Sequence, residues 1–210
     1  MVWIENQRKG SGMKRETICK IFSDLPTLHT PRLLLRPMRV SDAEDMFCYA
    51  CREDVTTYLL WSPHPSMRYT EDYLRYIQGR YSLGEFYDWA VVEKESRRMI
   101  GTCGFTRFEL PHNSGELGYV LNPEYHGRGY GTEAADRVLR FGFEVLKLHR
   151  IEAKFMQGNE ASLHVMEKLG MTLEGYRREG MLVKSSYRTI GVCSILRHEF
   201  EAGRHRRDNL

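Results

Sequence analysis

The spacing of hydrophobic and polar residues predicts an alternation of strands and helices along the chain. An apolar run at 33–35 predicts a short strand. Residues 41–44 then have a capping-box pattern, and apolar residues at helical spacing follow it, which predicts a first helix. Two more helices are predicted within 55–83, because apolar and aromatic residues there recur at intervals of three and four.

After Gly84 the pattern changes to short runs that are typical of strands. The runs at 86–93, 99–108 and 116–121 are joined by short turn-forming links, which indicates an antiparallel meander. A glycine-rich turn and a strongly amphipathic helix that ends near Leu146 come next. The remaining predicted elements are a strand at 151–156, a helix at 159–169, and strands at 172–182 and 187–196. Together they predict one α/β domain with a mixed, largely antiparallel sheet.

Length and composition agree with a single globular domain. The chain has 210 residues, of which 41% are hydrophobic and 28% charged. Residues 1–27 are polar and lack the apolar core of a secretory signal, so we expect a loosely ordered extension before a domain at 28–200. Residues 201–210 are expected to form a solvated tail. Because no apolar run approaches the roughly 18 residues of a membrane helix, we expect no membrane association.

Charge and cysteine content narrow the function classes. The 31 Lys and Arg residues against 28 Asp and Glu give a net charge of +3, which is too small for a nucleic-acid surface but compatible with one phosphorylated ligand. The five cysteines form an odd, sparse set, which favours free thiols and a cytoplasmic location. Cys48 and Cys51 have metal-ligand spacing, but they fall inside a predicted helix. We therefore expect buried thiols and no metal site.

The glycine-rich turn carries the most specific chemistry. Gly127, Gly129 and Gly131 alternate between a predicted strand and a predicted helix, where backbone N–H groups and the helix dipole attract an anion. Arg128 adds a positive charge, and glycine allows a ligand to approach the backbone closely. We interpret the turn as a phosphate-binding loop. A tight loop that needs glycine only for its geometry is the alternative.

Two common phosphate loops fit this segment poorly. A Walker loop ends in Gly-Lys-Ser or Gly-Lys-Thr, and the chain contains no Gly-Lys pair. A dinucleotide fingerprint matches at Gly129, Gly131 and Ala134, with Glu152 about 20 residues on. However, the predicted strand ends near Leu121, well before the glycines, and Glu152 begins the next strand rather than ending it. A nicotinamide-dependent enzyme is therefore kept as the weaker alternative.

A third pattern extends over much more of the chain. It comprises residues 122–134, Asn159 with Ser162, residues 167–171, and Glu174 with the following glycine. These segments resemble the GNAT acetyltransferases, most closely their RimJ/RimL-like branch. The stretch from Thr30 to Ala43 is similar to the opening of that branch, so the resemblance covers about residues 27–200.

The resemblance implies a seven-stranded, mostly antiparallel GNAT-like sheet with helices on both faces, and acetyl-CoA as the donor. It places the pyrophosphate on amides of the glycine turn and the pantetheine arm between the strands at 116–121 and 151–156. The implied cofactor-binding residues are Leu121, His126, Gly127, Arg128, Gly129, Tyr130, Gly131, Thr132, Asn159 and Ser162. His126 stands where the family usually has Gln or Arg before its G-x-G/A pair. Because backbone donors make most of the anion contacts, we expect binding to persist.

Acetyl transfer to an amine requires a proton acceptor for the amine and a proton donor for the departing thiolate. For the acceptor we predict Glu116, since strand alternation allows its carboxylate to face the cleft; an exposed strand-end carboxylate is the alternative. The resemblance implies that Asn159 contacts the pantetheine and that Ser162 protonates the sulfur. Both residue types are also common at helix starts, so helix capping is the alternative for this pair.

The acceptor is the least specific part of the prediction. Aromatic residues are frequent between 58 and 89, and in this family that region overhangs the acceptor site; we assign Trp61, Tyr87 and Glu116 to substrate binding. The predicted activity is direct acetyl transfer to a primary amine, either a protein N-terminal α-amine or a small molecule. A non-catalytic acyl-CoA-binding module is the competing hypothesis. A homodimer is also expected.

Overall fold

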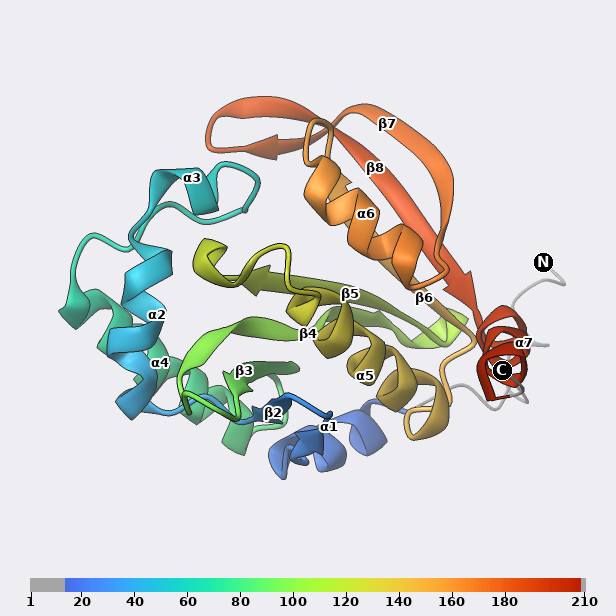
Figure 1. Ribbon diagram of the computed structural model, residues 1–210, viewed down its shortest axis with the longest axis horizontal. Coiled ribbons are helices and arrows are strands. Elements are labelled where there is room, and N and C mark those ends of the chain that lie inside the picture. Colours follow the sequence, from blue (N-terminus) through green and yellow to red (C-terminus); the bar gives the residue numbers. More distant parts are fainter. Residues whose placement is uncertain (1–13, 209–210) are drawn as a thin grey trace, which may run out of the picture.

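The computed structural model describes residues 14–208 and contains one eight-stranded sheet, in the order β1-β2-β3-β4-β5-β6-β8-β7 (Figure 1). The strands are β1 (Leu28–His29), β2 (Leu33–Arg36), β3 (Asp88–Glu93), β4 (Met99–Glu109), β5 (Ser114–Leu121), β6 (Arg150–Met156), β7 (Thr172–Val183) and β8 (Ser186–Leu196). The helices are α1 (Arg15–Ser23), α2 (Ala43–Ala50), α3 (Glu53–Thr56), α4 (Met67–Ser82), α5 (Tyr130–Glu144), α6 (Glu160–Lys168) and α7 (Arg197–Asp208).

The mixed, largely antiparallel sheet confirms the prediction, with one strand more than expected. Of the neighbouring strand pairs only β5 and β6 are parallel. The additional strand is β1, whose two residues pair with β2. The pairing of β5 with β6 ends at Leu117 and Ala153, although both strands continue. The sheet therefore opens into a wedge at its centre, between the two strands that were expected to hold a pantetheine arm.

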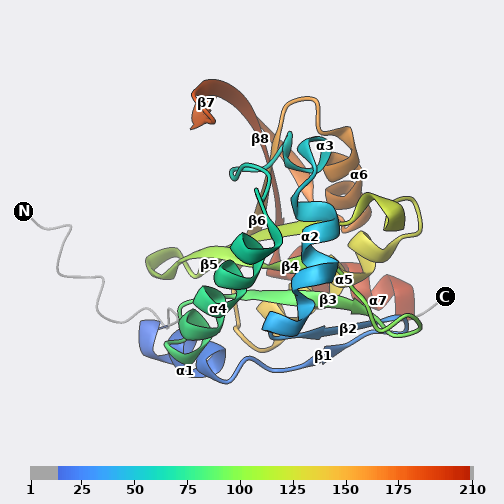
Figure 2. The ribbon, with the colours of Figure 1, turned by 90° about the vertical axis from the view of Figure 1, so that its left-hand side faces the viewer.

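Strand alternation divides the helices between the two faces of the sheet. The ring of Trp89 in β3 lies 5.3 Å from that of Phe141 in α5, so odd-numbered β3 residues face this helix. The preceding residue, Asp88, faces the side covered by α2 and α4, and the Tyr81 hydroxyl of α4 donates to its backbone carbonyl over 2.6 Å. Figure 2 views the molecule from the side where α2, α3 and α4 lie. The helices thus cover both faces, as the resemblance implies.

The segment before β1 belongs to the core. In α1 the Phe22 side chain has no exposed surface, and its ring contacts those of Tyr87, Trp89 and Phe141 at 4.8–6.1 Å. The Trp89 indole N–H donates to the carbonyl of Pro26 over 2.8 Å. The expectation of a loosely ordered extension is therefore wrong for residues 14–27, because an amphipathic helix covers the aromatic end of the sheet. Residues 1–13 lie outside the described part of the chain.

Two further expectations need correction. The capping-box pattern at 41–44 does not cap α2, whose N-cap residue, Asp42, makes no side-chain bond to the helix. The Asp42 carboxylate instead accepts hydrogen bonds from the Arg39 N–H and from both terminal nitrogens of Arg36. The expected C-terminal tail starts within α7, which runs to Asp208 and packs Phe200 onto Phe143 at 4.9 Å. The side chains of its basic cluster lie outside the described part of the structure.

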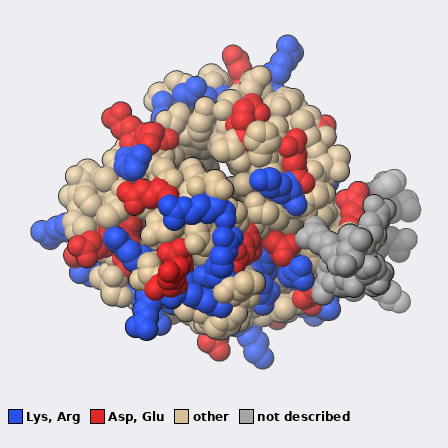
Figure 3. All heavy atoms as spheres, viewed as in Figure 1, with Lys and Arg blue, Asp and Glu red and all other residues tan. Residues whose placement is uncertain are grey.

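The surface carries no strong bias of charge on the face seen in Figure 3, where Lys and Arg alternate with Asp and Glu. Above the centre of this face the surface is hollowed, and most of the surrounding atoms are uncharged (Figure 3). None of the helices among the described residues is long and apolar enough to span a bilayer.

Candidate active site

A cavity of about 870 Å³ extends from the wedge between β5 and β6 to the sheet face below α2 and α4. Its lining contains residues from both strands of the wedge, such as Tyr119 and Phe155, and from the first turn of α6, such as Ser162. On the other side it is lined by aromatic residues of the segment between α3 and β3. Because pairing stops at Leu117, neither β5 nor β6 closes this space with backbone hydrogen bonds.

The glycine turn has the geometry of an anion-binding loop. Gly127 and Gly129 have left-handed backbones, with φ of 73° and 79°, and α5 begins directly after them at Tyr130. A side chain at Gly127 or Gly131 would meet no protein atom within 4 Å, so the space over both residues is open. The first N–H groups of a helix have no partner within it. The turn therefore fits a phosphate group at the N-terminus of α5.

Contacts with the N-terminal part of the domain hold this loop in place. Arg32 forms an ion pair with Glu133 in the first turn of α5 at 2.6 Å and donates to the Arg128 carbonyl over 2.9 Å. Its guanidinium also lies 4.3 Å from the centre of the Tyr130 ring. The Tyr130 hydroxyl donates to Glu93, so this side chain points into the protein. Of the predicted cofactor residues, Tyr130 can therefore offer a ligand only its backbone.

His126, the departure from the family pattern, has a structural contact. Its Nε2 atom lies 2.9 Å from the carbonyl of Leu121 and joins the loop to the end of β5. The imidazole ring is thereby directed at β5 and away from the loop backbone, where the space over Gly127 and Gly131 stays open. Leu121 and His126 do not line the cavity, which ends at Val120 on this strand. They lie between the cavity and the loop.

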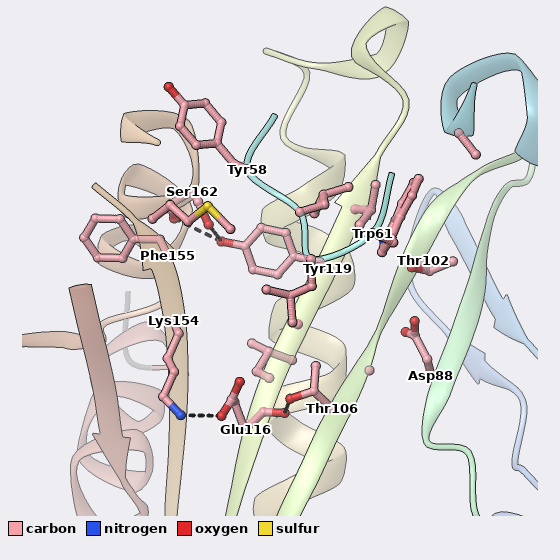
Figure 4. Close-up of a pocket in the computed structure, with 18 of the residues that line it drawn as sticks. Tyr58, Trp61, Asp88, Thr102, Thr106, Glu116, Tyr119, Lys154, Phe155 and Ser162 are labelled. Carbon is pink, nitrogen blue, oxygen red and sulfur yellow. Dashed lines mark hydrogen bonds and ion pairs between the residues drawn. The ribbon is translucent and has the colours of Figure 1, made fainter. Parts of the chain in front are cut away.

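Tyr119, Asn159 and Ser162 meet at the wedge. The Tyr119 hydroxyl lies 3.0 Å from both Oγ and the carbonyl oxygen of Ser162 (Figure 4). The Asn159 side chain accepts from the Ser162 N–H over 3.2 Å, so it caps α6 as the alternative for this residue predicted. Burial raises the pKa of Tyr119, and its hydrogen bond to Ser162 acts in the opposite direction. Tyr119 therefore remains a hydrogen-bond donor at neutral pH, and no sequence motif indicated it.

Glu116 lines the cavity, but it is not a free carboxylate. Its Oε2 atom lies 2.6 Å from Nζ of Lys154 (Figure 4). The same atom lies 2.9 Å from Nε of Arg107. The side chain is only 17% exposed, so it is not an exposed residue at a strand end. Both cations bind the same oxygen, and a proton would have to be accepted on Oε1. Its assignment as the base stays a prediction.

A second carboxylate in the cavity, Asp88, escaped the sequence analysis. Its Oδ1 atom is shielded from solvent and has no hydrogen-bond partner among the described residues. Burial raises the pKa of Asp88 to about 7, an effect that a hydrogen bond with Thr102 partly offsets. In Figure 4 Asp88 and Thr102 lie on the opposite side of the cavity from Glu116 and Lys154. A carboxyl group that titrates near neutrality in a cleft is a candidate for proton transfer.

Both predicted aromatic substrate residues, Trp61 and Tyr87, line the aromatic side of the cavity, and their role in substrate binding stays a prediction. Trp61 lines the cavity beside His64, with ring centres 5.3 Å apart, and the Tyr73 ring lies 5.6 Å from the same histidine. Tyr87 also belongs to the lining, but its ring packs on Phe22 and Phe108 at 4.8 and 5.0 Å. Its aromatic surface is thus used mainly in the core.

The cysteines are free thiols in the structure. Cys103 and Cys193 are buried, whereas Cys48 is exposed, so the expectation that Cys48 and Cys51 are both buried is wrong. Cys48 lies on the solvent side of α2. Among the described residues no group of three His, Cys, Asp or Glu side chains could hold a metal ion.

Comparison with known proteins identifies the family. The model of the acetyltransferase (GNAT) domain matches residues 32–172. The chain belongs to the GNAT acetyltransferases. A relative described as an uncharacterized N-acetyltransferase, p20 of Bacillus licheniformis, is 30% identical over 84% of this chain and 99% of the relative. Spermidine N(1)-acetyltransferase of Escherichia coli is 24% identical over 85% of this chain and 92% of its own.

A solved structure supports the same conclusion. The GNAT-family acetyltransferase from Bacillus anthracis superimposes with a TM-score of 0.74 and 28% identity, over 82% of this chain and 99% of that one. The protein is thus an N-acetyltransferase, and GNAT enzymes take their acetyl group from acetyl-CoA. The glycine turn does lie within a parallel unit, β5-α5-β6, but residues 122–126 separate the end of β5 from the first glycine, whereas the dinucleotide fingerprint follows its strand directly.

Proposed function

We propose that this GNAT enzyme acetylates a primary amine that enters the cavity from the side of α2 and α4. The observation that carries the proposal is the single cavity that joins the aromatic wall around Trp61 to Ser162 at the wedge. An acceptor on the aromatic side and a thioester in the wedge would meet in that space, which replaces a bimolecular encounter by a positioned one.

The donor would lie along features that the chain already provides. Acetyl-CoA supplies the thioester whose C–S bond breaks. Backbone N–H groups between Gly127 and Thr132 would bind its pyrophosphate, and the wedge beside Tyr119 would take the pantetheine arm. Ser162 Oγ, hydrogen-bonded to Tyr119, would give a proton to the departing sulfur. Asn159, held at the start of α6, lines the same space.

Direct attack by the amine fits the chemistry of the cavity. A transfer through an acetylated enzyme would need a cysteine nucleophile, and none lines the cavity among the described residues. Cys103, which lies on β4, is buried, and burial raises its pKa well above the ordinary value. A thiol of this kind is a poor nucleophile.

Three finer assignments stay predictions. They are the RimJ/RimL-like branch, a protein N-terminus as acceptor, and a homodimer. The free state of all five cysteines supports a cytoplasmic location, because disulfides form in oxidising compartments.

The donor site can be tested by thermal shift with CoA, acetyl-CoA, NADH and ATP. A ligand at about 100 times its dissociation constant stabilises by ~2.7 kcal/mol, which for a domain of this size raises Tm by about 5–10 °C. We expect this rise with CoA and acetyl-CoA and not with NADH. A shift with NADH alone would contradict the proposed donor site.

Two glycine variants sharpen this test. Gly129→Ala places a side chain on a left-handed backbone, which costs about 1 kcal/mol and disturbs the loop, so we expect less than half the wild-type shift. Gly79→Ala is the matched control, because Gly79 is helical in α4, its side chain would enter open space, and it lies outside both the loop and the cavity lining. It should keep the full shift. Equal shifts in both variants would show that the loop does not bind the donor.

A further inference from the structure

Asp88 lies at one end of a row of residues that leads across the sheet to the wedge. It pairs with Gly104 of β4, and Gly104 pairs with Gly118 of β5. Directly paired residues project to the same face of a sheet, so Gly104 and Gly118 place no side chain of their own between Asp88 and the wedge, and the Thr106 side chain lies against Gly118. A side chain at Gly104 would lie 2.3 Å from the carbonyl of Tyr87 and 2.8 Å from Oδ1 of Asp88. The glycine is therefore required for Asp88 to occupy this place.

Asp88 has no cationic neighbour in the cavity. Lys154 is the one lysine or arginine of the described lining, and it binds Glu116 at 2.6 Å and Glu152 at 3.1 Å. His64 also lines the cavity, but burial lowers its pKa, which keeps the ring neutral at pH 7. The carboxylate of Glu116 is thus matched by charge within the protein, while that of Asp88 is not.

The groups that face Asp88 from the covering elements are aromatic hydroxyls and small polar groups. They are Tyr49 of α2, Tyr73 and Tyr81 of α4, and Thr102 of β4. The Tyr49 hydroxyl is itself buried and without a hydrogen-bond partner among the described residues. An unsatisfied carboxylate oxygen and an unsatisfied hydroxyl in one cavity are both costly to the free protein. A ligand with several N–H donors would satisfy both.

Aromatic surface above this point favours the same kind of ligand. The rings of Trp61, Tyr69 and Tyr73 surround His64 at 4.9–5.6 Å and line the cavity. Aromatic faces attract organic cations, and they cover the apolar part of an amine. A carboxylate beside the amine of the ligand would be repelled by the carboxylate of Asp88, which disfavours free amino acids.

We propose that Asp88 binds the acceptor amine as an ammonium ion and takes its first proton, so that the acceptor is a cationic amine without a neighbouring carboxylate. This inference rests on the proposed function. The nitrogen gives one proton to Asp88 and becomes the free amine. It then forms the C–N bond as the C–S bond breaks. Its second proton passes to Oγ of Ser162, which gives its own hydroxyl proton to the departing sulfur, so CoA leaves as the thiol and Ser162 ends unchanged. Asp88 later returns its proton to solvent.

The test compares wild type with Asp88→Asn, which keeps the size of the side chain. Phenethylamine and phenylalanine are used as probes, since they differ only in the carboxylate. In the CoA-bound protein, calorimetry should show phenethylamine binding that weakens at least tenfold in Asp88→Asn, with CoA affinity unchanged within twofold. Phenylalanine should bind wild type at least tenfold more weakly than phenethylamine. Glu85→Gln is the control, because Glu85 also lines the cavity but is paired with Arg80 at 3.0 Å.

Two further measurements are informative. Thermal stability of the free protein does not depend on turnover, and the pH profile of kcat/KM separates proton transfer from binding. In the free protein, Asp88→Asn should exceed wild type in Tm most at pH 8 and least near pH 4, because a carboxyl whose pKa folding raises to about 7 costs stability progressively between about 3.9, its pKa in the unfolded chain, and 7. In turnover, the pH profile of kcat/KM should lose its ionisation near pH 7 in Asp88→Asn.

The outcomes distinguish this inference from the proposed function. If wild type acetylates amines and Asp88→Asn binds and acetylates phenethylamine as wild type does, the role of Asp88 is wrong and the proposed function stands. Equal binding of phenylalanine and phenethylamine would overturn the substrate class. If wild type binds CoA but neither binds nor acetylates any amine, the proposed function fails and the inference fails with it.

Discussion

Replacing Ser162 with alanine is expected to lower kcat for acetyl transfer by about 100-fold, the lower part of the range for losing a general acid. The Ser162 hydroxyl lies at the wedge, 3.0 Å from that of Tyr119, where a thiolate would depart. Acetyl-CoA affinity should stay within twofold, because the Ser162→Ala variant keeps the backbone N–H that Asn159 caps and the backbone carbonyl that Tyr119 reaches. Steady-state release of CoA thiol in the presence of an amine measures kcat, and calorimetry measures affinity.

Two variants control for this substitution. His164→Ala changes an exposed residue of the same helix and should leave kcat unchanged. Tyr119→Phe removes the hydroxyl that holds Ser162, so we expect a loss between those of His164→Ala and Ser162→Ala. A wild-type kcat in Ser162→Ala with intact acetyl-CoA binding would exclude Ser162 as the proton donor.

Replacing Phe22 with alanine should destabilise the protein by about 3–5 kcal/mol. The ring has no exposed surface and packs between α5 and β3, against Trp89 at 5.7 Å and Phe141 at 6.1 Å. Its removal leaves a cavity that the neighbouring rings cannot readily fill, since Trp89 is held in β3 and Phe141 in α5. Equilibrium denaturation in urea measures the free energy of unfolding.

Thr17→Ala is the matched control, because Thr17 is exposed on the same helix. It should change the free energy of unfolding by no more than about 0.5 kcal/mol. A Phe22→Ala variant as stable as wild type would mean that α1 does not pack on the domain in solution.

The central strands could be predicted because both of their faces are buried, which makes β3 and the first part of β4 short, nearly continuous apolar runs. The long helices bury one side, and a period of 3.6 residues marked α4 and α5. β1 has only two residues, which is too short for any period to show. α1 was missed because its many polar residues hid the pair Ile18 and Phe22, four positions apart, which is the one signal that could have revealed it.

The candidate site was predictable where it depends on local sequence. The glycine turn and the cap at Asn159 are short motifs, and the structure places both at helix starts. The ion pair of Glu116 with Lys154 depends on the register of two parallel strands that lie far apart in sequence. The environment of Asp88 depends on glycines in two other strands, so the residues next to Asp88 in the sequence could not predict that it lies in the cavity.

Transfer of labelled acetyl from acetyl-CoA to a panel of primary amines tests the central claim most directly. The panel would include phenethylamine, polyamines and peptides with a free N-terminus, and the product would be identified as an amide by mass spectrometry. We expect the label to appear on at least one amine, with the rate falling about 100-fold in Ser162→Ala. Tight binding of acetyl-CoA with no label on any amine would contradict the account, and would indicate a module that binds acyl-CoA without catalysing transfer.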